Sequence, residues 1–182
     1  PALLKVFSNR NLVLAGAAAM EKLDKNQKTA SQECIELLKM FEGVRLERYL
    51  DSAGLPTIGV GHLIRDGESF QKITLAQAEQ LLKKDIAAAA KSVNRSAHLF
   101  LNQQQFDALV SFVFNIGVGN FEKSTMLRLL NKGQYKAAAG EFDRWAYVKL
   151  ELSKGLARRR AVEKALFLGA TLSMCRDLWG KT

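Results

Sequence analysis

The chain has 182 residues, of which 48% are hydrophobic and 25% are charged, and it contains two cysteines. This length fits one domain, or one domain with a short appendage, and the apolar content can bury a core without disulfides or metals. Cys34 and Cys175 are too few for the disulfide framework of a small secreted protein. Each is expected to pack as a small hydrophobe, with a bridge between them as the alternative.

The formal net charge is +9, and its distribution is uneven. Residues 144–182 carry nine basic and three acidic side chains, so +6 of the excess lies in the last fifth of the chain. A basic protein attracts polyanions such as nucleic acid, anionic lipid or an acidic cell-wall polymer. The sequence has no arginine-rich element with interleaved aromatics, so nucleic acid is disfavoured. The basic C-terminal stretch is either a solvated face or a contact with an anionic membrane or outer-membrane surface.

Residues 1–30 are predicted to form a segment separate from the domain at residues 31–182. The apolar run at residues 12–20 is far shorter than the roughly 20 residues that a bilayer-spanning helix needs. Lys5 and Arg10 precede it, as in the charged end of a signal peptide, but the flanks do not fit a cleavage site. An amphipathic helix on the domain or on a membrane surface is therefore favoured over a weak, releasable membrane signal.

The first helix of the domain is expected to begin after Ser31, a capping residue, and to end before Gly43. Apolar side chains recur between them at helical spacing: Ile35, Leu38 and Phe41. Glu42 is thus predicted at the C-terminal end of this helix. Residues 46–64 then combine β-forming side chains with Gly and Pro, which predicts a small β lobe of short strands joined by tight turns.

Helical spacing resumes at Thr74, which with Gln77 forms a capping-box pattern. The longest helix, of about twenty residues, is predicted from there to about residue 94. Further helices are predicted at residues 103–115, 122–131, 135–145, 156–168 and 172–178. This order indicates an α+β protein with two unequal lobes, and the cleft between lobes is where a polymer would bind.

Glu42 and Asp51 lie on the two sides of the predicted junction between helix and strand. Partial burial beside Phe41 would favour the protonated form of Glu42, whereas Asp51 in a polar turn should stay ionised. An acid and a base in unlike environments are what glycoside hydrolysis uses. The pair alone is weak evidence, because Glu42 can be a plain surface residue and Asp51 can simply cap a turn.

The residues around Glu42 and Asp51 form a more specific pattern than the two carboxyl groups alone. Residues 41–63 read FEGVRLERYLDSAGLPTIGVGHL, which resembles the signature of the phage-type lysozymes, glycoside hydrolase family 24: Glu-Gly, an aromatic, Asp, Gly, then Thr-Ile-Gly-x-Gly-His. The similarity extends over residues 32–168, about three quarters of the chain. Further matching positions are Phe114-Asn115-Ile116-Gly117, Asn120-Phe121, Ser124-Thr125, Arg144-Trp145, Gly155-Leu156-x-Arg-Arg-Arg, Glu163 and Leu166-Phe167.

This resemblance implies a small β-hairpin lobe and a larger helical lobe, joined by a long helix and flanking a saccharide cleft. It also implies an endolysin that hydrolyses the β-1,4 bond between N-acetylmuramic acid and N-acetylglucosamine and so lyses the host cell. By position, Glu42 would be the general acid, and Asp51 and Thr57 would hold the attacking water. With a threonine at that place, inversion of configuration is expected.

Supporting roles carry over in the same way. The resemblance makes Arg159 the partner of Glu42, whereas Arg158 and Arg160 fit an exposed basic helix end better. It pairs His62 with Asp85 of the long helix, a structural pair that would fasten the β lobe. Three positions match substrate-contacting residues of the family: Leu63, Phe114 and Asn115.

No cofactor is expected, and no metal site, because His62 and His98 are the only histidines. The protein is expected to be a monomer that stays in the host cytoplasm until release and then acts on the wall or periplasm. A cationic protein that permeabilises membranes is the rival hypothesis. A degenerate wall-binding domain and a lytic transglycosylase are two further hypotheses.

Overall fold

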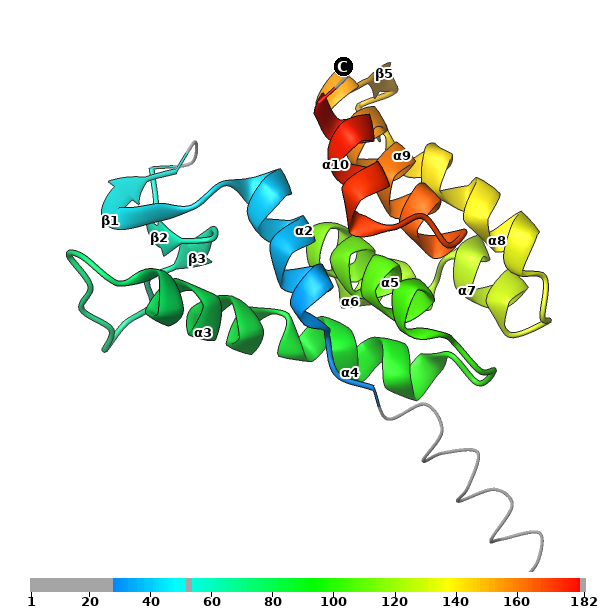
Figure 1. Ribbon diagram of the computed structural model, residues 1–182, viewed down its shortest axis with the longest axis horizontal. Helices are drawn as coiled ribbons and strands as arrows, with labels where there is room; N and C mark the ends of the chain where they lie inside the picture. Colours follow the sequence, from blue (N-terminus) through cyan, green and yellow to red (C-terminus); the bar gives the residue numbers. More distant parts are fainter. Residues whose placement is uncertain (1–27, 52–53, 181–182) are drawn as a thin grey trace, which may run out of the picture.

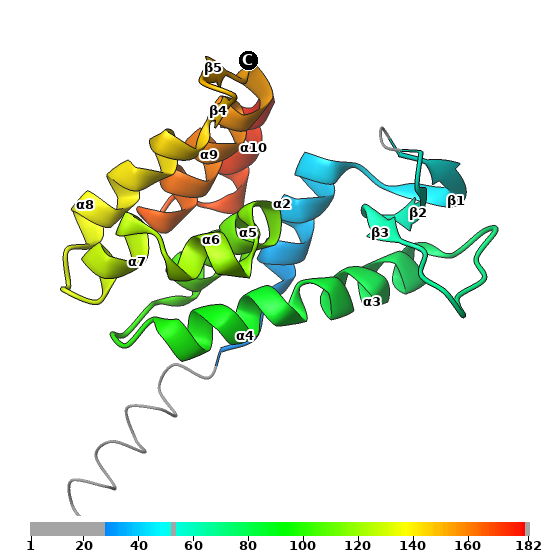
Figure 2. The same cartoon turned by 180° about the vertical axis from the view of Figure 1, so that it is seen from behind.

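The computed structural model describes residues 28–51 and 54–180. Most of the predicted N-terminal segment therefore lies outside the described residues. Figure 1 shows a small sheet at one end of the molecule and a group of helices at the other, with α2 between them. Helices α3 and α4 run end to end beneath both, as the view from behind also shows (Figure 2).

The predicted first helix is present as α2 (Gln32–Glu42). The Ser31 side chain caps it by accepting a hydrogen bond from the Cys34 N–H, and Gly43 ends it with a φ of 75°. That left-handed conformation suits glycine, and it turns the chain out of the helix directly after Glu42. Glu42 is thereby held at the point where the chain leaves the helix for the sheet.

The small lobe contains a three-stranded antiparallel sheet, in the order β1 (Arg45–Leu50), β2 (Pro56–Gly59) and β3 (His62–Leu63). Thr57 on the central strand lies opposite Tyr49 of β1 and Leu63 of β3. A small apolar cluster packs the sheet onto α3: Ile58, Ile73, Ala78 and Leu81. The prediction of a small β lobe is confirmed.

The predicted long helix is present as two helices, α3 (Leu75–Asp85) and α4 (Ala87–Ser96), interrupted at Ile86. The ψ of Ile86 is −8°, far from the roughly −42° of a regular helix. Leu81 packs in the small cluster under the sheet, whereas the next residue, Leu82, and Ile86 pack into the large helical core. The interruption therefore lies where the helix passes from one core to the other.

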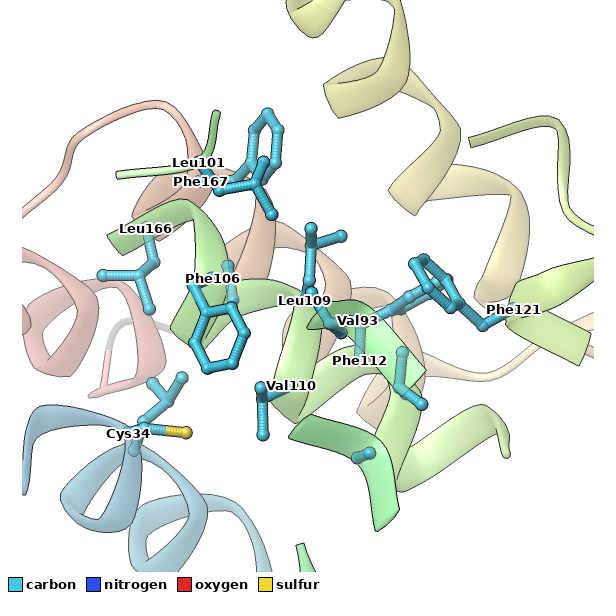
Figure 3. Close-up of a cluster of buried hydrophobic side chains, with 14 of the residues drawn as sticks. Cys34, Val93, Leu101, Phe106, Leu109, Val110, Phe112, Phe121, Leu166 and Phe167 are labelled. Atoms are coloured by element: carbon cyan, nitrogen blue, oxygen red, sulfur yellow. The ribbon is translucent and has the colours of Figure 1, made fainter. Parts of the chain in front are cut away.

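The helical lobe is built around α5 (Gln103–Ile116), whose residues 106–113 are all buried. This helix packs against α4, α2 and α9 (Lys154–Phe167). Figure 3 shows Phe106, Leu109, Val110 and Phe112 directed into the core beside side chains from other helices. The remaining helical elements are α6 (Val118–Glu122), α7 (Thr125–Leu130), α8 (Tyr135–Gly140), the 3₁₀ helix η1 (Glu141–Trp145) and α10 (Leu172–Gly180).

Two predicted helices were too long. The helix predicted at 122–131 is divided because Ser124 begins a new one, its side chain accepting a hydrogen bond from the Leu127 N–H. The helix predicted at 135–145 is α-helical only to Gly140 and continues as η1. A hairpin of β4 (Tyr147–Val148) and β5 (Glu151–Leu152) was not predicted, because its turn lacks Gly, Asn and Asp.

Cys34 and Cys175 are both free and buried, which agrees with their predicted packing as small hydrophobes. Among the described residues, no helix combines the length and the apolar character that crossing a bilayer requires.

Candidate functional site

Glu42 is held by an arginine from the far end of the sequence. Arg159 Nη1 on α9 donates to Glu42 Oε1 at 2.6 Å, and the Arg159 guanidinium lies 4.8 Å from the centre of the Phe41 ring. The Glu42 side chain is 28% exposed, whereas that of Arg159 is only 7% exposed. The expected contact is therefore present, and it fixes the direction of the carboxyl at the end of α2.

A fully buried carboxylate stands behind this arginine. Arg159 Nε donates to Glu163 Oε1 at 3.1 Å, and the Ser111 hydroxyl of α5 donates to the same oxygen at 2.7 Å. Arg160 Nε lies 3.1 Å from Glu163 Oε2, and Arg160 Nη2 donates to Asn115 Oδ1 at 2.6 Å. Glu163 thus joins the arginine that holds Glu42 to the arginine that holds Asn115.

Burial perturbs both members of the Arg160–Glu163 pair. Desolvation raises the pKa of the Glu163 carboxyl, while the two guanidiniums and the Ser111 hydrogen bond oppose that rise. Desolvation also lowers the pKa of Arg160 to about 10, against the charge of Glu163. Two positive groups around one carboxylate favour its ionised form, so we treat Glu163 as an anion.

The prediction of an exposed helix end was wrong for Arg160, whose side chain has no exposed surface. The helix repeat explains this: Arg160 and Arg159 lie three and four residues before Glu163, so both can reach it. That spacing was readable in the sequence. Arg158 is partly buried, with its guanidinium 4.2 Å from the centre of the Trp179 ring.

Asp51 and Thr57 meet at the backbone of Leu55, in the turn between β1 and β2. The Leu55 N–H donates to Asp51 Oδ1 at 2.9 Å. The Leu55 carbonyl accepts from the Asp51 N–H at 2.9 Å and from the Thr57 hydroxyl at 3.0 Å. Thr57 is buried, and Asp51 is partly exposed. The turn therefore holds both side chains against one residue.

His62 forms the expected pair with Asp85, with Nδ1 2.8 Å from Asp85 Oδ2. Its other nitrogen lies 3.1 Å from Glu68 Oε2, a partner that the sequence did not predict. The pKa of Glu68 is lowered, first by the hydrogen bond from the Arg65 N–H and then by His62. His62 thus links β3 to α3 and to the loop that follows β3.

A pocket of about 280 Å³ lies where the two lobes meet. Its wall includes Leu63 of β3, Asp85 of α3 and Phe114 of α5, so three predicted site residues share one cavity. Apolar and small residues complete much of the wall: Gly61, Ala88, Ala89, Val113, Gly117 and Val118. Glu42, Asp51, Thr57 and Asn115 lie outside this wall, so the pocket is a neighbouring part of the predicted site.

The described ranges, 28–51 and 54–180, hold no group of three or more His, Cys, Asp or Glu side chains arranged to bind a metal ion.

Residues 39–163 match the phage lysozyme family model. The endolysin of Bacillus phage PZA is 43% identical over 78% of this chain, but the match covers only 55% of that protein, so this chain spans little more than half its length. The endolysin of Salmonella phage P22 is 44% identical over 76% of this chain and 97% of its own length.

Solved structures are similar over most of the chain. A crystal structure of a P22 lysozyme mutant has a TM-score of 0.73 and 41% identity, covering 78% of this chain and 99% of that one. The muramidase domain of SpmX from Asticaccaulis excentricus has a TM-score of 0.70 and 38% identity, with 78% and 99% coverage. The family match alone runs from the last turn of α2 to Glu163 on α9, and so it includes all the predicted site residues.

Proposed function

Because the chain belongs to the phage lysozyme family, we propose that it is an endolysin, a muramidase that hydrolyses the β-1,4 bond between N-acetylmuramic acid and N-acetylglucosamine in bacterial peptidoglycan. The observation that most supports this is the Glu42–Arg159 ion pair of 2.6 Å at the junction of the lobes. It fixes the direction of a carboxyl at the end of α2, where the chain leaves that helix for the sheet that carries Thr57.

In this mechanism Glu42 is the general acid. It gives its proton to the glycosidic oxygen as the bond to the leaving sugar breaks, and it becomes a carboxylate. Arg159 stabilises that carboxylate through the hydrogen bond at 2.6 Å. Arg159 favours the ionised form of Glu42, whereas a general acid must carry a proton before the reaction. A second anionic partner of Arg159 is therefore needed to weaken its effect on Glu42, and Glu163 is such a partner.

Asp51 and Thr57 hold and activate the water that attacks the opposite face of the sugar. The Asp51 carboxylate accepts the proton of that water, while the Thr57 oxygen orients it. A water between acid and base requires the two carboxyl groups to be roughly 6.5–9.5 Å apart, and the product then has the inverted configuration.

The remaining predicted residues position the substrate and the lobe. Leu63 and Phe114 on the pocket wall offer apolar surface to sugar rings, and Asn115 offers an amide to their acetamido or hydroxyl groups. His62 and Asp85 hold the sheet against α3 through their contact of 2.8 Å. The contact between His62 and Asp85 thereby fixes the position of β3, which carries Leu63, relative to α3.

The decisive experiment is digestion of purified peptidoglycan followed by mass spectrometry of the fragments. Reducing N-acetylmuramic acid ends are expected, whereas anhydro-muramic ends would identify a lytic transglycosylase. Glu42→Gln should lose at least about a hundredfold in rate, the share that a general acid contributes. Proton NMR of the fresh products should show the inverted anomer.

Glu47→Gln is the matched control, because Glu47 on the neighbouring strand is 71% exposed and pairs only with exposed Lys72 among the described contacts. It should keep the rate of the unchanged protein. If Glu42→Gln folds and still releases fragments at the normal rate, Glu42 is not the acid and the proposed mechanism fails.

The protein would act on the cell wall or periplasm after release from the host cytoplasm, as a monomer. A contact between the basic C-terminal stretch and an anionic membrane has less support, because several of its cations are already occupied. Arg159 and Arg160 are buried with Glu163, and Lys164 lies 2.6 Å from Asp143. The rival membrane-permeabilising function predicts that Glu42→Gln still lyses cells.

A further inference from the structure

The proposed acid, which is partly exposed, is the outer end of a chain of four charged groups, and the other three are buried. Glu42, Arg159, Glu163 and Arg160 are linked in that order by contacts of 2.6, 3.1 and 3.1 Å. Two carboxylates and two guanidiniums make this chain neutral when Glu42 is ionised, and positive by one charge when Glu42 is protonated. The protonation of Glu42 is therefore coupled to how the other three groups share their charge.

The position of Glu163 makes it the centre of this chain. Its carboxylate has no exposed surface, and it contacts both guanidiniums as well as the Ser111 hydroxyl. In a buried site the interaction between charges is weakly screened, so removing one charge changes the others strongly. A water-exposed carboxylate at this distance from Glu42 would have much less influence.

We propose that Glu163 is a positioning residue that divides the positive charge of Arg159 between itself and Glu42, and so sets the highest pH at which Glu42 still carries the proton that the reaction needs. This inference rests on the proposed role of Glu42 as the acid. Glu163 touches no substrate; it acts only through Arg159.

The charged and titratable groups around Glu163 come from few elements. From its own helix these are Arg159 and Arg160, and from α2 they are Glu42, through Arg159, and the Cys34 thiol. Burial, with the charges of Asp107 and Glu163, keeps the pKa of Cys34 well above 9.0, so the thiol stays neutral. Other charged groups beside α9 are paired elsewhere: Asp143 of η1 with Lys164, and Arg176 of α10 with Glu36.

The first test is Glu163→Gln, which keeps the shape and removes the charge. Arg159 then has Glu42 as its only carboxylate partner in the chain of four, and it favours the ionised form of Glu42 more strongly. The alkaline limb of the kcat–pH profile should move to lower pH by about one unit, with roughly tenfold loss of kcat above the new limb. Glu163→Asp keeps the charge and should return the limb towards its original position.

The second test has the opposite sign. Arg160→Gln removes a positive charge from the chain, so Arg159 becomes the only guanidinium in the chain that pairs with Glu163. Arg159 then stabilises the ionised form of Glu42 less strongly. The alkaline limb should move to higher pH. The double variant Glu163→Gln with Arg160→Gln removes one charge of each sign, and its limb should lie between those of the single variants. Damage to the fold cannot produce shifts in two directions.

Two controls separate this inference from its premises. Thermal unfolding of every variant gives the folded fraction, and Glu151→Gln makes the same change at an exposed glutamate of β5. Titration of the Glu42 carboxyl by carbon-13 NMR, with the signal assigned through Glu42→Gln, reports the same shifts without any activity. An inactive protein whose Glu42 titration still moves in the expected directions would contradict the proposed function and support the inference.

The inference is overturned if the Glu163→Gln limb and the Glu42 titration stay where they are in the unchanged protein. Activity that falls equally at every pH, in proportion to the folded fraction, would mean that Glu163 only stabilises the fold. If Glu163→Gln fails to fold, Arg160→Gln decides. The inference is overturned if the alkaline limb of that variant stays in place or moves to lower pH.

Discussion

Asp107 shows how burial and hydrogen bonding oppose each other at a single side chain. It is 1% exposed, on α5, and accepts hydrogen bonds from the Ser31 hydroxyl at 2.5 Å, the Ser31 N–H at 3.0 Å and the Gln103 amide at 3.0 Å. Burial raises its pKa above the ordinary 3.8, although these bonds oppose the rise. One carboxyl thereby ties the start of α2, the helix that carries Glu42, to the central helix.

This raised pKa predicts a pH-dependent stability. The folded protein binds the proton of Asp107 more tightly than the unfolded chain does, so its contribution is greatest below about pH 4 and is lost as the pH rises through the folded-state pKa. Asp107→Asn cannot titrate. The free energy of unfolding of the unchanged protein, relative to this variant, should fall as the pH rises from about 4 to about 7.

Urea denaturation at a series of pH values measures this difference. Asp143→Asn is the control, since the Asp143 side chain is 59% exposed and should show little of the effect. A relative stability that rises with pH would contradict the assigned direction.

At the scale of an element, the hairpin of β4 and β5 carries an unusual turn. Both central residues have positive φ, 48° for Lys149 and 70° for Leu150, and Leu150 is 95% exposed. Paired positive φ values match the twist of a two-residue hairpin, but side chains with a Cβ are strained there, at a cost of about 1–2 kcal/mol for each residue. The tertiary structure therefore imposes a turn that the local sequence disfavours.

Replacing Leu150 by glycine should relieve this strain. Leu150→Gly is expected to raise the free energy of unfolding by about 0.5–1 kcal/mol, since the gain in the turn exceeds the entropy that glycine costs. Differential scanning calorimetry would detect the higher Tm. Leu152→Gly, on an exposed strand position with ordinary φ, should instead lower it. Equal destabilisation by both changes would show that the turn is not strained.

For the whole molecule, the net charge of +9 remains after the buried pairs cancel. Glu42 with Arg159, and Glu163 with Arg160, contribute nothing to this excess, so it belongs to other side chains. Peptidoglycan stem peptides carry carboxylates, and a basic enzyme is attracted to them over distances that salt shortens. Under the proposed function, charge at this scale would govern how the protein reaches the wall rather than the cleavage of the glycosidic bond.

Wall clearing should therefore depend on salt more than the chemical step does. Between about 20 mM and about 300 mM NaCl, the initial clearing rate is expected to fall by roughly threefold to tenfold as the Debye length shortens. Hydrolysis of a soluble, uncharged oligosaccharide, followed by release of reducing ends, should change by less than about twofold over that range. Equal salt dependence for the two substrates would place the effect in the active site.

The sequence by itself determined those features that depend on neighbouring residues. Ser31 and Gly43 marked both ends of α2, the Thr74–Gln77 pattern marked the start of α3, and β-forming residues punctuated by Gly and Pro marked the small sheet. The motif around Glu42 identified the family and hence the expected contacts of Glu42 with Arg159 and of His62 with Asp85. Helix caps, tight turns and sequence motifs each depend on residues that are close together in the chain, so they can be recognised without the fold.

Only the tertiary structure decided which distant groups share one environment. It interrupted the long helix at Ile86, where the helix passes from the small apolar cluster to the large helical core, and it placed Lys149 and Leu150 in a hairpin turn. It also gave His62 a second partner in Glu68 and buried Arg160 beside Glu163. These outcomes depend on burial, which sets the cost of each charge, and burial is known only when every element has been packed against its neighbours.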